Sequence, residues 1–148
     1  MRKFIHYIEN EELFNKFRNL SLYYINLEKS NNKIFALGDA SNPKKAITAA
    51  YIIDPSLNAK KDFLHHKNTG LTLQTLAEIK KKKTTLILPF DHIIKNKHPH
   101  KIIARFAAIV KLSRKYNISL IYAKKVEHKD DFFSISQFKD FERFFSFF

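Results

Sequence analysis

Short runs rich in β-branched and aromatic residues alternate with helical patterns along the chain, and this alternation limits the fold more than any other feature. Strand-like runs occur at Lys3–Ile8, Ser21–Leu27, Lys33–Leu37, Ala50–Ile53, Thr84–Pro89 and Ile118–Ala123. Helical patterns occur at Glu11–Arg18, Pro43–Ala49, Leu71–Lys82, Pro99–Tyr116 and Ser136–Phe147. Alternating strands and helices are typical of βαβ units, so the sequence predicts an α/β fold with a mainly parallel sheet.

The length of 148 residues fits one domain. A complete eight-fold barrel takes roughly 250 residues, so a barrel here would have to be reduced or incomplete. The first third offers two strands, within Ser21–Leu37, that are separated only by Lys29–Asn32. We therefore expect a hairpin in that segment in place of a strand–helix–strand crossover.

Several functional classes are excluded by composition. The chain has no cysteine, so thiol catalysis and thiolate metal sites are ruled out, and an intracellular, cytoplasmic location is expected. No apolar run approaches the roughly 18 residues that span a bilayer. The basic and apolar start is followed by Glu9, Glu11 and Glu12, so we expect neither a signal peptide nor a membrane partner.

Positive charge is concentrated in the middle of the sequence. The formal net charge is +13, and residues 40–125 carry 18 Lys and Arg against four Asp and Glu, whereas the two ends together carry nine against ten. A basic region of this kind favours a polyanionic partner such as nucleic acid. The alternative is a coding bias toward lysine, in which case the chain is a non-enzymatic basic interaction protein.

The segment Asp62–Gly70 places two histidines and Lys67 just before a predicted helix. Asn68 or Thr69 is the expected N-cap of a helix that begins near Leu71. Free N–H groups at a helix start and a nearby lysine suit a phosphate. The alternative is a capping loop in which the basic residues are incidental.

The segment Pro99–Tyr116 predicts an amphipathic helix with a basic outer face. At 100° per residue, Ile102, Ile103, Phe106, Ile109 and Val110 share one arc, opposite Lys101, Arg105, Lys111 and Lys115. No acidic residue interrupts this helix, which favours phosphate binding over a merely solvated surface. Charge reversal at Arg105 and Lys115 is therefore expected to weaken RNA binding with little loss of stability.

Two further patterns leave alternatives open. His98, His100 and Asp91 could hold a divalent ion in a reduced metal-dependent phosphoesterase, although the surrounding lysines oppose a cation. No Ser-His-Asp arrangement is visible. The C-terminal segment carries more phenylalanines than one buried stripe can hold, so some of them either close the sheet or form a protein interface. The candidate interface residues are Phe138, Phe141, Phe144, Phe145 and Phe148.

The order of these segments resembles a known family. DFLHHKNTGL at Asp62–Leu71, the strand Thr84–Phe90 followed by Asp91–Ile94, and RFAAIVKLSRKYNIS at Arg105–Ser119 are similar to protein component 3 of archaeal and eukaryotic ribonuclease P. The resemblance is strongest over 54–148, and residues 1–40 are shortened and divergent. The matching residues are His66, Lys67, Asn68, Gly70, Leu71, Arg105, Arg114, Lys115 and Tyr116.

The resemblance implies a single domain over 1–148 with a reduced TIM-like barrel of mainly parallel strands and outer helices. It also implies a non-catalytic RNA-binding subunit of ribonuclease P, in which the RNA removes the 5′ leader of precursor tRNA and holds any magnesium. The expected partners are that RNA, precursor tRNA and a small RRM-like protein, with self-association as a further possibility. The basic middle region and the family-like loop together give the expected RNA-binding residues, which are His66, Lys67, Asn68, Arg105, Lys111, Arg114, Lys115, Lys124 and Lys125.

Overall fold

The computed structural model describes residues 4–8, 11–16, 22–24, 34–36, 51–56, 62 and 67–147. The strands are β1 (Phe4–Ile8), β2 (Leu22–Tyr24), β3 (Ile34–Ala36), β4 (Tyr51–Ile53), β5 (Thr85–Pro89) and β6 (Leu120–Lys125). The helices are α1 (Glu11–Lys16), α3 (Leu73–Lys82), α4 (Phe90–Ile94), α5 (Pro99–Tyr116) and α6 (Ile135–Ser146), with a 3₁₀ turn at Lys129–Asp131. The predicted helix Pro43–Ala49 lies outside the described residues.

The strands form one sheet in the order β2-β1-β6-β5-β4-β3, and every neighbouring pair is parallel. The prediction of an α/β fold is therefore confirmed. The predicted hairpin is wrong, because β2 pairs with β1 and β3 pairs with β4, at opposite ends of the sheet. A hairpin would need the two strands to be antiparallel neighbours, and each finds a parallel neighbour elsewhere.

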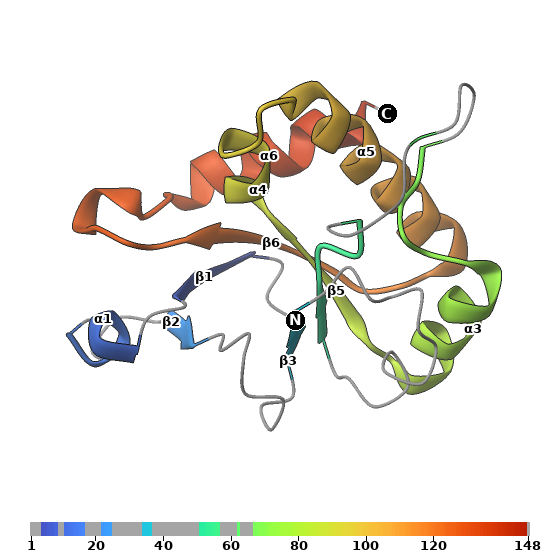
Figure 1. The fold of residues 1–148 in the computed structure, drawn as a ribbon, viewed down its shortest axis with the longest axis horizontal. Coiled ribbons are helices and arrows are strands. Elements are labelled where there is room, and N and C mark those ends of the chain that lie inside the picture. The colour runs from blue at the N-terminus through green and yellow to red at the C-terminus, as the bar shows by residue number, and fades with distance from the viewer. Residues whose placement is uncertain are drawn as a thin grey trace.

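Both faces of the central strands are covered. All five residues of β5 are buried, which suits its continuous apolar sequence Leu86–Leu88. One face packs against α3, α5 and α6, and Figure 1 shows α5 and α6 along the outside of the sheet. The opposite face carries a second cluster formed by Ile5, Tyr7, Ile53, Ile87, Ile121 and Ala123.

Local signals set the ends of the helices. α5 begins at Pro99 and ends at Tyr116, where Asn117 with a φ of 55° caps the helix, so it has the predicted bounds. α3 begins two residues later than predicted, because the Thr72 hydroxyl accepts the Thr75 N–H and acts as the N-cap. Ser134 and Gln137 form a capping box at the start of α6. Across the described residues, every helix is too short or too polar to cross a membrane.

The C-terminal helix is mainly a core element, which corrects part of the predicted protein interface. Phe138, Phe141 and Phe145 are buried against the sheet, and Phe145 is 0% exposed. These three side chains are unavailable to a partner in this fold. Phe144 is 45% exposed and remains a candidate, whereas Phe148 lies outside the described residues.

Candidate functional site at the carboxyl end of the sheet

Polar residues follow three neighbouring strands at the point where each strand ends. Asp54 comes directly after β4, Asp91 and His92 lie in α4 directly after β5, and Lys124 and Lys125 close β6. Because these strands are parallel, their carboxyl ends share one edge of the sheet. Ligands of α/β proteins bind at that edge, so it is the first place to look for a site.

Asp54 and His92 form a close pair at this edge. The Nδ1 atom of His92 lies 2.6 Å from Oδ2 of Asp54, whose side chain is 1% exposed, whereas the His92 side chain is 24% exposed. The other carboxylate oxygen accepts the N–H of Ser56 at 3.1 Å and the Ser56 hydroxyl at 2.6 Å. The carboxylate is therefore fully engaged by donors, and it fixes the orientation of the imidazole.

Asp62 joins the predicted loop to helix α5. Its Oδ1 atom accepts the N–H of Asn68 at 2.8 Å and Nε of Arg105 at 3.0 Å. Burial raises the pKa of Asp62, but the Asn68 N–H and the Arg105 guanidinium outweigh it and hold that pKa below its usual value. The Asp62 carboxylate thus ties the loop before α3 to helix α5.

Arg105 connects α5 to the loop before α3, which corrects the prediction that its side chain lies on the solvent-exposed face of its helix. Its side chain is 13% exposed, and one guanidinium N–H donates to the carbonyl oxygen of Ser56 at 3.2 Å. A glutamate at this position would face the Asp62 carboxylate, and the hydrogen bonds from Arg105 to Asp62 and to the Ser56 carbonyl oxygen would be lost. Charge reversal at Arg105 would therefore disturb the site itself, and it is unsuitable as a test of surface RNA binding.

The loop before α3 packs closely on the end of β4. Gly70 has a φ of +74°, and a Cβ atom there would lie 1.9 Å from the carbonyl oxygen of Pro55. Only glycine fits this close approach, and the Asn68 side chain accepts the Gly70 N–H at 3.1 Å. The N-cap is Thr72, so the prediction of Asn68 or Thr69 was wrong. Lys67 is exposed, and His66 lies outside the described residues.

A second charge cluster lies beside the first. Lys124 is buried, and its Nζ donates to Oδ1 of Asp91 at 2.8 Å, while the N–H of Lys125 donates to Oδ2 at 2.6 Å. Lys124 is therefore occupied inside the protein, which corrects its prediction as a phosphate contact. Hydrogen bonds from Lys125 and Lys95 lower the pKa of Glu127.

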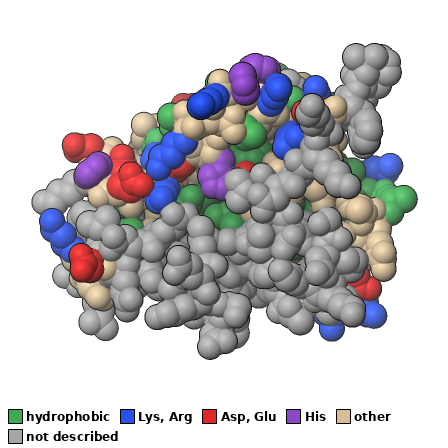
Figure 2. All heavy atoms as spheres, viewed as in Figure 1, with side chains coloured by type: hydrophobic (Ala, Val, Ile, Leu, Met, Phe, Trp, Pro, Cys, Tyr) green, Lys and Arg blue, Asp and Glu red, His purple; other side chains and the backbone are tan. Residues whose placement is uncertain are grey.

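The remaining predicted basic residues lie on the exposed surface of α5. Lys101, Lys111, Arg114 and Lys115 are all exposed. Figure 2 shows Lys, Arg and His side chains over α4 and the first turns of α5. α5 runs back toward the start of β6, so Lys115 lies about 15 Å along the helix axis from Arg105. The predicted RNA-binding set is thus divided between the carboxyl edge and the far end of this helix.

The alternative of a metal site at His98, His100 and Asp91 is not assembled in the structure. His98 and His100 are exposed with ring centroids 5.9 Å apart, whereas both carboxylate oxygens of Asp91 are held by Lys124 and Lys125. Within the described residues, no group of three or more His, Asp or Glu side chains is placed to hold a metal ion.

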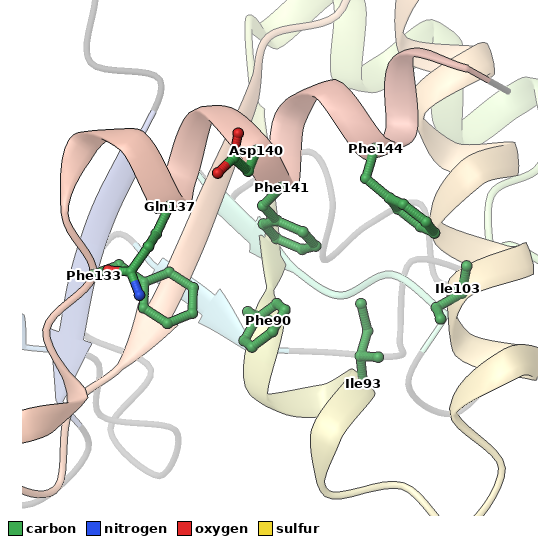
Figure 3. Close-up of a pocket in the computed structure, with 8 residues that line it drawn as sticks. All are labelled: Phe90, Ile93, Ile103, Phe133, Gln137, Asp140, Phe141 and Phe144. Carbon is green, nitrogen blue, oxygen red and sulfur yellow. The ribbon is translucent and has the colours of Figure 1, made fainter.

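An apolar groove opens between α4, α5 and α6. Its volume is about 360 Å³, and Figure 3 shows Phe144 beside Ile103 and Ile93, with Phe90 and Phe133 farther along. The remaining lining residues are Gln137, Asp140 and Phe141. Phe144 is thus the member of the predicted aromatic interface that both borders a groove and is exposed.

Comparison with known proteins gives no family assignment. No protein-family model matches the chain, and no curated protein matches it.

Proposed function

We propose that the protein is a cytoplasmic RNA-binding subunit of ribonuclease P that supports RNA-catalysed removal of the 5′ leader from precursor tRNA. The observation that carries this proposal is the exposed basic surface of α5, which includes Lys101, Lys111, Arg114 and Lys115 and contains no acidic residue. Such a surface neutralises phosphates without reading bases. It coincides with the helix whose sequence resembles the component 3 family.

The strand order supports the finer proposal of a reduced barrel. From one edge to the other it runs β3, β4, β5, β6, β1, β2, which is chain order after one cyclic shift. A barrel of six parallel strands that is open between β2 and β3 would have this order. The second apolar cluster, which includes Tyr7 of β1 and Ile53 of β4, also suits the interior of a curved sheet.

Charge reversal on α5 tests the RNA-binding proposal. We expect Lys111→Glu with Lys115→Glu to weaken binding of ribonuclease P RNA, and to reduce the slope of log K against log salt concentration by about two, one for each lost phosphate contact. Both side chains are exposed, so each change should cost stability within about 0.5 kcal/mol. Filter binding between low and moderate salt measures the slope.

The matched control is Lys81→Glu with Lys82→Glu on α3, which makes the same change in net charge at exposed positions. We expect this control to retain most of the salt dependence of the original protein. If both double variants lose affinity equally, only net charge matters and α5 is not the RNA surface. If the original protein binds RNA with no dependence on salt, the proposal fails.

We further propose that the small RRM-like subunit packs against the groove bordered by Phe144. Binding hot spots lie in well-packed pockets, and truncating one costs about 2 kcal/mol or more of binding energy. Phe144→Ser is expected to weaken binding of that subunit about tenfold or more with the fold retained. Phe147→Ser is the control, since Phe147 is 83% exposed and does not line the groove. Calorimetry that gives equal affinities for all three proteins would reject this surface.

A further inference from the structure

We propose that Asp54 and His92 form a phosphate-binding site at the carboxyl end of the sheet, with Nε2 of His92 as the donor to a phosphate oxygen. Asp54 holds Nδ1 of the same ring at 2.6 Å. The ligand chemistry is that of a phosphate group, in a small phosphate ester or in a nucleic-acid backbone. That the phosphate belongs to RNA rests on the proposed function.

The geometry assigns a role to each ring nitrogen. An ionised carboxylate can only accept hydrogen bonds, so Nδ1 of His92 must carry the proton that lies between it and Asp54. Nε2 is then left for another partner, and within the described part of the chain it has none. The Nδ1 side of the His92 ring faces the Asp54 side chain, which is 1% exposed, whereas the His92 side chain as a whole is 24% exposed. The available nitrogen is therefore on the accessible edge.

The imidazole is held in place before any ligand arrives. Asp54 has a φ of 40°, an uncommon conformation for a residue with a side chain, and its N–H donates to the carbonyl of Ile87 at 2.8 Å. The Ser56 hydroxyl donates to the other carboxylate oxygen of Asp54, and the Ser56 carbonyl oxygen accepts a hydrogen bond from Arg105. A donor fixed in this way loses little conformational freedom on binding, which favours affinity. Local backbone strain of this kind also tends to occur at ligand sites.

The carboxylates on the neighbouring elements are paired with cations, so their charge does not oppose an anion at this point. Arg105 of α5 pairs with Asp62, Lys124 of β6 pairs with Asp91, and Lys125 pairs with Glu127. The nearby carboxylates are thus each matched by a cation. The negative charge of Asp54 is matched by the imidazolium form of His92, whose second N–H can then donate to a phosphate.

The direct test follows the histidine ring signals by NMR while inorganic phosphate is added near pH 6. We expect phosphate to shift the Nε2 and Cε1 signals of His92 but not those of His98 and His100, which are exposed internal controls at the start of α5. His92→Gln should reduce affinity for RNA by about tenfold, the effect of one charge-assisted hydrogen bond.

The control variant His98→Gln with His100→Gln should keep most of the RNA affinity of the original protein. If phosphate leaves the His92 signals unchanged, or shifts all three histidines equally, the inference is overturned even though RNA binding through α5 can stand. If His92 responds to phosphate but RNA does not bind, the proposed function fails while the site remains, with a small phosphate ester as its ligand. If the His92 signals still respond to phosphate in a folded Asp54→Asn variant, Asp54 is not part of the site.

Discussion

Truncating Phe145 to alanine is expected to lower the free energy of unfolding by about 3–5 kcal/mol. The side chain is 0% exposed and lies among aromatic rings, with centroids 5.2 Å from Phe141, 6.2 Å from Phe106 and 6.3 Å from Tyr122. Its removal would leave a cavity that this fixed cluster cannot fill. Urea denaturation followed by circular dichroism measures the loss.

Phe147→Ala provides the matched comparison, because the same truncation two residues later removes a side chain that is 83% exposed. It should change stability by no more than about 0.5 kcal/mol. Phe145→Leu, which keeps most of the volume, remains measurable if the alanine variant does not fold. Equal effects at Phe145 and Phe147 would contradict the assignment of α6 as a core helix.

Replacing Lys124 with methionine is expected to destabilise the protein by about 3–5 kcal/mol, because it leaves the buried carboxylate of Asp91 without its cation. The two side chains are 9% and 8% exposed, and their atoms lie 2.8 Å apart. Methionine keeps most of the volume of lysine, so the loss would report the charge and not a cavity. Thermal and urea denaturation measure the change.

The double variant Lys124→Met with Asp91→Asn separates the ion pair from the rest of the site. We expect it to recover part of the lost stability, because the amide carries no charge that needs a partner. Lys111→Met, at an exposed position, should be close to neutral. If Lys124→Met keeps full stability and loses only RNA affinity, Lys124 is a surface phosphate contact after all and the structural assignment is wrong.

Local sequence was sufficient to predict the class of fold and the position of most described elements. α5 has the predicted bounds because Pro99 and Asn117 act through their own backbone conformations. β5 was predicted from a continuous apolar run, which in this structure is buried on both faces. These signals arise within a few residues of each element, so they do not depend on how the chain packs.

Tertiary packing decided which predicted side chains face solvent. Periodicity placed Arg105 with the basic face of α5, but it could not show that Asp62 would lie against that part of the helix. Periodicity also could not decide how many aromatic positions of α6 the sheet would cover. Phe138, Phe141 and Phe145 proved to be core residues for that reason.

The sequence by itself therefore determined the alternation of strands and helices, the basic middle region and the acid-free surface of α5. The strand order and the polar site were decided only by the tertiary structure. His92 lies 38 residues from Asp54, Arg105 lies 43 from Asp62, and Lys124 lies 33 from Asp91. No short spacing marks these pairs. They meet because parallel strands bring the residues that follow them to one edge, and strand pairing is set by contacts across the whole chain.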